Sequence, residues 1–97
     1  MMNIASRYTV YKLLGSGTYG KVLKCADNKY NQHPVAVKIV RKDNNLFHEA
    51  AKKEIKMLGI LNGQHGTVRM LRAFQHQGHV CISFELLGES LFAHLER

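Results

Sequence analysis

The sequence predicts an α+β fold in which one helix packs on an antiparallel sheet of five strands. Two features of the chain support this prediction. Segments rich in β-branched, aromatic and aliphatic residues follow one another in the order of three strands, one helix and two strands. Glycine-bearing turns separate the first two strands and the last two, which predicts two hairpins.

The first two predicted strands, 8–14 and 22–26, flank the glycine-rich segment 15–20, which reads Gly-Ser-Gly-Thr-Tyr-Gly. Its three glycines lack β-carbons, so the backbone can approach a triphosphate closely and adopt the dihedral angles of a tight turn. We therefore interpret it as a hairpin that lies over phosphate groups. A dinucleotide site is the alternative, but that site requires a helix after the last glycine and an acid about 20 residues further on. Lys38 stands eighteen residues after Gly20, whereas the position of Asp43 leaves the alternative open.

The third predicted strand, 34–40, carries a lysine inside an apolar run. Strand alternation places Lys38 on the same face as Ala36 and opposite Val37 and Ile39. Such a lysine either extends its amine to water at a sheet edge or holds the amine in a cleft. Because the glycine-rich segment lies upstream, we favour the cleft, with the ammonium group facing phosphate oxygens beneath the hairpin.

The stretch 46–61 predicts a helix, with an N-cap supplied by the asparagines at 44–45. Five residues share one helical face at spacings of four, three, four and three: Phe47, Ala51, Glu54, Leu58 and Leu61. A carboxylate on an apolar face is costly unless a cation meets it, so Glu54 is expected to pair with Lys38. Glu49 is the rival acid, but it lies off this face near the helix N-terminus, where an acid is favourable anyway. A local partner or a solvated helix edge is the remaining alternative for Glu54.

The last two predicted strands are 67–74 and 79–87, joined by a compact turn at 75–78 that ends in glycine. After them, Ser90 is suited to cap a short helical segment at 91–95.

The glycine segment followed by Val22, together with the Val-Ala-Val-Lys run that ends at Lys38, resembles the nucleotide-binding half of the protein kinase signature. Residues 79–90 and 49–55 are similar to the LAMMER, or CDC-like, kinases of the CMGC group, and DYRK-type kinases are the near alternative. The resemblance implies that residues 1–97 form the N-terminal, ATP-binding lobe of a protein kinase, with the C-terminal lobe absent from this sequence.

The resemblance also implies residue roles. Lys38 would contact the α and β phosphates and Glu54 would hold it in place, while Val22 and Ala36 would sandwich the adenine. Phe84 matches the gatekeeper position at the back of the pocket. The backbones of Glu85 and Leu87 match the hinge groups that bind the adenine edge, and Leu58 and Met70 match a regulatory hydrophobic stack. The implied cofactor-binding set is Leu14, Gly15, Ser16, Gly17, Thr18, Tyr19, Gly20, Val22, Ala36, Lys38, Glu54, Phe84, Glu85 and Leu87.

The implied activity is ATP-dependent phosphorylation of serine and threonine, with dual specificity, and with Arg/Ser-rich splicing factors as substrates. The motifs H-R-D-x-x-x-x-N, D-F-G and A-P-E do not occur in the 97 residues. We therefore expect this chain by itself to be inactive and the Mg ligands to lie in the C-terminal lobe. A non-catalytic, pseudokinase-like module that binds nucleotide or a partner is the alternative function.

Composition agrees with one small domain: 97 residues, 45% of them hydrophobic. We expect an intracellular protein because the sequence shows no secretory start and no apolar run long enough for a membrane. The resemblance to LAMMER-like kinases implies a nuclear setting, and a cytoplasmic one is also expected. Cys25 and Cys81 are interpreted as buried thiols. No metal site is expected at the scattered histidines, and the net charge of +7 is not taken as a sign of nucleic-acid binding, since no exposed aromatics accompany the basic residues.

Overall fold

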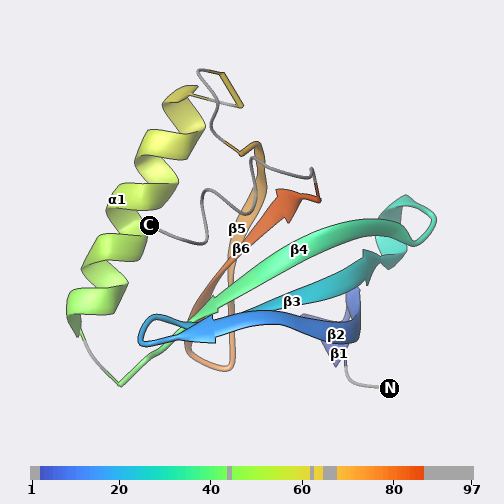
Figure 1. Ribbon diagram of the computed structural model, residues 1–97, viewed down its shortest axis with the longest axis horizontal. Coiled ribbons are helices and arrows are strands. Elements are labelled where there is room, and N and C mark those ends of the chain that lie inside the picture. The colour runs from blue at the N-terminus through green and yellow to red at the C-terminus, as the bar shows by residue number, and fades with distance from the viewer. Residues whose placement is uncertain (1–2, 44, 62, 65–67, 87–97) are drawn as a thin grey trace.

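The computed structural model describes residues 3–43, 45–61, 63–64 and 68–86. In this part of the chain, six strands form one antiparallel sheet in the order β1-β2-β3-β4-β6-β5, and the helix α1 packs on it (Figure 1). The strands are β1 (Asn3–Ile4), β2 (Tyr8–Gly17), β3 (Gly20–Asp27), β4 (His33–Val40), β5 (Met70–His76) and β6 (His79–Glu85). The helix α1 spans Asn45–Leu61, and a 3-10 turn, η1, spans Asn28–Tyr30.

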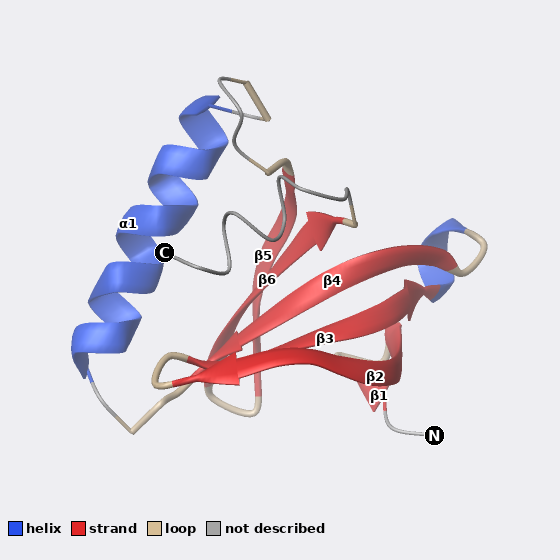
Figure 2. Cartoon of the chain, viewed as in Figure 1, coloured by secondary structure: helices blue, strands red, loops and turns tan. Residues whose placement is uncertain are grey.

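The predicted α+β fold is confirmed, with corrections at the element ends. The five predicted strands correspond to β2–β6, and the pairing of Asn3 and Ile4 with Thr9 and Tyr8 adds the short strand β1. The glycine-rich segment is mostly strand, since β2 runs to Gly17 and β3 starts at Gly20 (Figure 2). The strand expected from residue 67 is assigned from Met70. Asn44, Ser90 and the expected helical segment 91–95 lie outside the described residues.

Register divides the sheet into two faces. Residues directly opposite one another on neighbouring strands share a face. Val22, Lys38 and Ile82 are opposite one another on β3, β4 and β6, and they lie on the side that α1 covers, here called the helix face. The next row along, Leu23 and Val37, lies on the other side, here called the concave face.

Both faces carry buried apolar side chains. One cluster lies between the helix face and α1 and consists of Val22, Ala36, Leu58, Val68, Ile82 and Phe84. A second cluster lies on the concave face and consists of Ile4, Tyr8, Cys25, Val35, Val37 and Cys81. Ala51 of α1 packs with Val40 and Val80 in a third, smaller cluster. The predicted apolar side of α1 therefore meets the sheet.

The sheet curls so strongly that β2 and β5 meet across its concave side. The rings of Tyr8 and Phe74 stack with centroids 5.3 Å apart and an interplanar angle of 18°. The Tyr8 hydroxyl lies 3.5 Å from Ser83 Oγ, and Arg72 donates to the same hydroxyl at 3.4 Å. These contacts close part of the concave face and bury the second cluster.

A bidentate ion pair ties the start of β2 to the end of β3. Arg7 Nε and Nη2 donate to the two carboxylate oxygens of Asp27 at 2.8 and 2.9 Å. Asp27 is 4% exposed and also accepts the backbone N–H of Lys29, which caps the turn η1. The Arg7 guanidinium holds the pKa of the Asp27 carboxyl below its usual range, and the carboxylate raises the pKa of Arg7.

Candidate nucleotide-binding site

The glycine hairpin is held in place at its turn. Gly20 has φ +139°, and a β-carbon there would stand 2.0 Å from the carbonyl oxygen of Ile39, so only glycine fits. The carbonyl of Tyr19 accepts the backbone N–H of Arg41 at 2.7 Å. The tip of the hairpin is therefore fixed against the end of β4, the strand that carries Lys38.

Beneath this hairpin, Lys38 and Glu54 form the ion pair that the helical face of residues 47–61 predicts. Lys38 Nζ lies 3.1 Å from Glu54 Oε1 and 3.3 Å from Oε2. The two side chains are 15% and 24% exposed, so the pair is shielded from bulk water but reachable from the cleft. The rival acid Glu49 pairs with Lys52 at 3.4 Å on the exposed side of α1.

The sequence places Tyr19 in the glycine-rich segment but does not predict where its ring lies. Its ring folds back under the hairpin, where Lys38 Nζ lies 5.0 Å from the ring centroid. A β-carbon added to Gly17 would stand 2.9 Å from Tyr19 Cε1, so the missing side chain at Gly17 makes room for the ring. Burial raises the pKa of the Tyr19 phenol.

Tyr19, Lys38 and Glu54 share a small cavity of about 80 Å³ between the hairpin, β4 and α1. Val40 and three α1 residues, Phe47, Ala50 and Ala51, complete its lining. The cavity places an ammonium group, a carboxylate and a phenol ring around one small space. The Tyr19 ring therefore occupies part of the space beside the Lys38 ammonium group.

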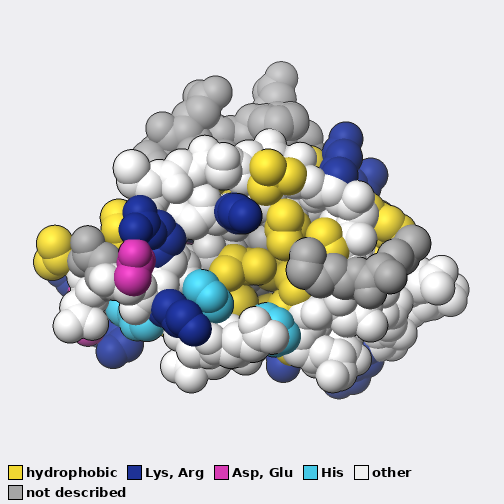
Figure 3. Space-filling view, turned by 90° about the horizontal axis from the view of Figure 1, so that it is seen from below, with side chains coloured by type: hydrophobic (Ala, Val, Ile, Leu, Met, Phe, Trp, Pro, Cys, Tyr) yellow, Lys and Arg dark blue, Asp and Glu magenta, His cyan; other side chains and the backbone are white. Residues whose placement is uncertain are grey.

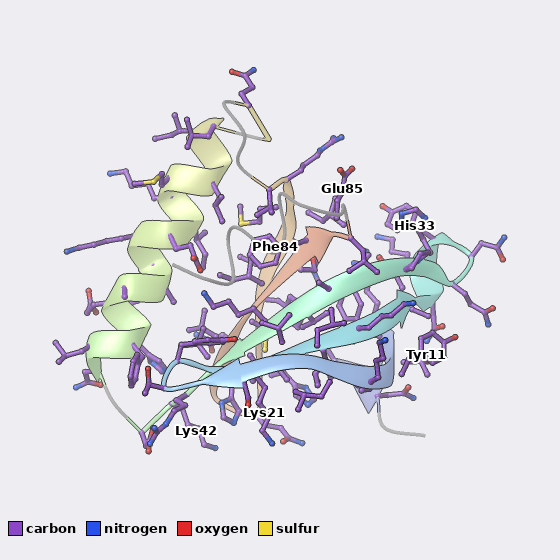
Figure 4. All side chains as sticks on the ribbon, viewed as in Figure 1. Tyr11, Lys21, His33, Lys42, Phe84 and Glu85 are labelled. Atoms are coloured by element: carbon purple, nitrogen blue, oxygen red, sulfur yellow. The ribbon has the colours of Figure 1, made fainter. Side chains whose placement is uncertain are left out.

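The residues expected to surround adenine are grouped on the helix face. Val22, Ala36 and Phe84 are 0–1% exposed in the first cluster, and Leu14 and Tyr19 pack against it. Ala36 and Phe84 are directly opposite on β4 and β6, and Figure 4 shows Phe84 on the side of the sheet that faces α1. Leu58 and Met70 contact the same cluster.

The remaining members of the predicted set lie at the two ends of this apolar patch, in the glycine hairpin and at the end of β6. Gly15 is half-buried in β2, while Ser16 and Thr18 are exposed at the hairpin tip. Glu85 ends β6; its backbone N–H donates to the carbonyl of Arg69 at 3.1 Å, and its carboxylate lies 3.5 Å from Arg69 Nη1. Leu87, the second predicted hinge residue, lies outside the described residues.

No group of three or more His, Cys, Asp or Glu side chains is arranged to hold a metal ion within the described ranges. The described helix α1 also lacks the length and apolar character needed to cross a membrane.

Comparison with known proteins gives the family. Residues 8–97 match the protein kinase domain. The dual specificity protein kinase CLK1 of Mus musculus is 46% identical over 94 residues, which cover 92% of this chain and 19% of that protein. The dual specificity tyrosine-phosphorylation-regulated kinase mbk-2 of Caenorhabditis elegans is 41% identical over 100 residues, covering 98% of this chain and 12% of its own length. The dual specificity protein kinase KNS1 of Saccharomyces cerevisiae is 43% identical over 91 residues, which cover 89% of this chain and 12% of that protein.

The curled sheet, the single described helix and these similarities define the N-terminal region of a protein kinase domain. The chain belongs to the protein kinase family, and among its relatives are both CLK kinases and DYRK-type kinases of the CMGC group. The chain spans about a fifth or less of the length of the curated relatives it matches.

Proposed function

We propose that this chain is the ATP-binding lobe of a dual-specificity protein kinase that transfers the γ-phosphate of ATP to protein hydroxyls. One observation carries the proposal: the Lys38–Glu54 ion pair lies directly beneath a glycine hairpin whose turn is fixed to β4. An ammonium group held by a carboxylate under backbone N–H groups is an arrangement suited to phosphate oxygens.

Each part of the site has a physical task in this proposal. Lys38 donates to the α and β phosphates, and Glu54 keeps the ammonium group from turning away. The glycines let the backbone approach the phosphates. Val22 and Ala36 supply the apolar surface for the adenine ring, and because both are 0% exposed, the ring enters only when side chains packed on their cluster move. Mg, bound by groups outside this set, would neutralise the phosphate oxygens when ATP is present.

The finer assignments rest on resemblance. Similarity to CLK1, which is named as a dual specificity protein kinase, supports phosphorylation of tyrosine as well as serine and threonine. The likeness of residues 79–90 to LAMMER kinases supports Arg/Ser-rich splicing factors as substrates and a nuclear or cytoplasmic location. We also propose that the 97-residue chain by itself transfers no phosphate, because it contains neither H-R-D nor D-F-G. Incubation with labelled ATP, Mg and an Arg/Ser peptide checks this, and transfer above that of a Lys38→Met variant would contradict it.

An acyl phosphate of ATP tests nucleotide binding directly. A lysine amine beside the bound phosphates attacks the acyl carbonyl, an amide forms and ATP leaves, so mass spectrometry identifies the lysine concerned. We expect Lys38 to be acylated in preference to the exposed Lys53, and excess ATP to suppress the reaction at Lys38 alone. Glu54→Gln should reduce labelling of Lys38, whereas Glu49→Gln should leave it unchanged. Acylation spread evenly over the exposed lysines and insensitive to ATP would refute the proposed function.

A further inference from the structure

A second hollow lies on the concave face, on the opposite side of the sheet from Lys38. It has a volume of about 400 Å³ and lies at the mouth of the curled sheet, between β1, the starts of β3 and β6, and the ends of β4 and β5. Its apolar floor is formed by Ile4, Leu23 and Ile39. Leu13, which is opposite Leu23 on β2 and 53% exposed, extends this floor toward the sheet edge. The volume lies within the ~300–1,000 Å³ of typical ligand pockets.

The rim of this hollow is basic. Lys21, Arg41, His76 and His79 line it, and Lys42 stands beside it with its Nζ donating to the carbonyl of Gln77 at 3.0 Å. Figure 3 views the molecule from this side and shows hydrophobic side chains in a hollow bordered by Lys, Arg and His side chains. Figure 4 places Lys21 and Lys42 along the same lower edge of the sheet. The acid found at this rim among the described residues is Asp43, which is paired with Arg41.

The two imidazoles are oriented by backbone groups. His76 Nδ1 accepts the backbone N–H of Ala5 at 3.1 Å, so the neutral ring carries its proton on Nε2, a donor for a carboxylate. His79 Nδ1 lies 2.9 Å from the carbonyl of Val40; because a carbonyl only accepts, Nδ1 carries the proton there. These contacts fix both rings at the rim.

We propose that this hollow is a docking site for a partner protein's acidic segment, in which apolar side chains enter the hollow and flanking Asp or Glu residues face the basic rim. Charge complementarity selects this occupant. A second copy of the same face would bring Lys21, Arg41 and Lys42 against themselves, which like-charge repulsion opposes. A lipid surface matches the charge, but a concave floor suits inserted side chains better than a flat bilayer. The proposal does not depend on ATP binding.

Titration of the isotope-labelled 97-residue chain with three peptides, followed by NMR, tests the docking site. The first peptide alternates Glu pairs with Leu and Phe, the second replaces Glu with Lys, and the third replaces Leu and Phe with Ser. We expect the first peptide to bind, with shifts at Leu23, Ile39, His76 and His79 and none at Lys38 or Glu54. The other two peptides should bind at least about fivefold more weakly.

Matched charge reversals locate the interaction. Lys21→Glu with Arg41→Glu changes two exposed rim residues and should weaken binding of the acidic peptide at least about fivefold. Lys53→Glu with Lys56→Glu makes the same change in net charge on the exposed side of α1 and should leave binding within about twofold. Equal weakening by both pairs, equal binding of the basic peptide, binding of anionic vesicles in place of the peptide, or dimer formation through this face would each overturn the proposal.

Discussion

Removing the charge of Asp27 should destabilise the fold strongly, because this carboxylate is nearly buried and its partner Arg7 lies beside it at the same end of the β2–β3 strand pair. Asp27→Asn keeps the side-chain volume, and the amide oxygen still accepts the N–H of Lys29. What is lost is the charge that meets Arg7 through two hydrogen bonds of 2.8 and 2.9 Å. The pair holds the base of the β2–β3 hairpin, whose other end is the glycine turn over Lys38.

The magnitude follows from burial. Breaking a fully buried ion pair costs about 3–5 kcal/mol because the remaining charge is left unpaired. Two effects reduce this cost. The Arg7 side chain is 19% exposed, against 6% for Asp27, so water still solvates part of the guanidinium group. A neutral hydrogen bond from Arg7 to the asparagine also contributes about 1 kcal/mol. A net loss of about 2 kcal/mol remains, which lowers the Tm of a domain of this size by about 8–16 °C.

The effect should also depend on pH with a definite sign. The folded-state pKa of Asp27 lies below its unfolded value, so the carboxylate contributes stability above the unfolded pKa, and that contribution is lost as pH falls through the folded pKa. Thermal unfolding followed by circular dichroism should therefore show a constant Tm difference between wild type and Asp27→Asn from pH 5 to 8, shrinking below about pH 4.

The chain contains its own matched control. Arg41 and Asp43 form a second bidentate Arg–Asp pair, but those side chains are 48% and 60% exposed. Solvent screens exposed pairs, so Asp43→Asn should leave Tm within experimental error. If Asp27→Asn lowered Tm no more than Asp43→Asn, or by an amount independent of pH down to pH 2, the reasoning from burial would be refuted.

Three further predictions concern the site and the core. In the complete kinase, Glu54→Gln should lower kcat/KM at least about tenfold in steady-state assays, because the ammonium group of Lys38 is no longer held. Glu49→Gln should match wild type. If Glu49→Gln lowered kcat/KM and Glu54→Gln did not, the predicted helical register would be wrong. Tyr19→Ala should increase acylation by the ATP acyl phosphate severalfold, since the ring covers the ammonium group; unchanged labelling would show that the ring does not compete with phosphates. Burial raises the pKa of Cys25 and Cys81 to about 11. At pH 8 both thiols of the folded chain should therefore react with iodoacetamide at least about 100-fold more slowly than the thiols of the chain unfolded in urea. Fast reaction in the folded chain would contradict their burial.

The contact between β4 and α1 was predictable because two periodicities converge on it. Strand alternation puts Lys38 on the face of Ala36, and the helical period puts Glu54 among apolar residues. Burying an ammonium group or a carboxylate on an apolar face costs free energy, and that cost is lowest when the two groups pair with each other. The structure contains that arrangement at 3.1 Å.

Other features depend on geometry that no local pattern carries. The strand β1 has two residues, too few for alternation to be recognised. The position of the Tyr19 ring depends on the backbone of the hairpin turn and on the space left at Gly17. The Arg7–Asp27 pair becomes visible only when the register opposes Tyr8 to Asp27, because the two charged residues are twenty positions apart.

The hollow on the concave face has its origin in the composition of the central strands. Strands β3 and β4 are apolar on both faces, with Val22 and Ala36 on one and Leu23 and Val37 on the other. Such strands require two covers, and the described part of the chain contains a single helix, α1, which covers the helix face. The curl that stacks Tyr8 on Phe74 covers much of the other face but ends before Leu23 and Ile39, which remain half-exposed between basic side chains. An apolar floor left uncovered beside a predominantly basic rim is more readily explained by an external ligand than by the stability of the lobe itself.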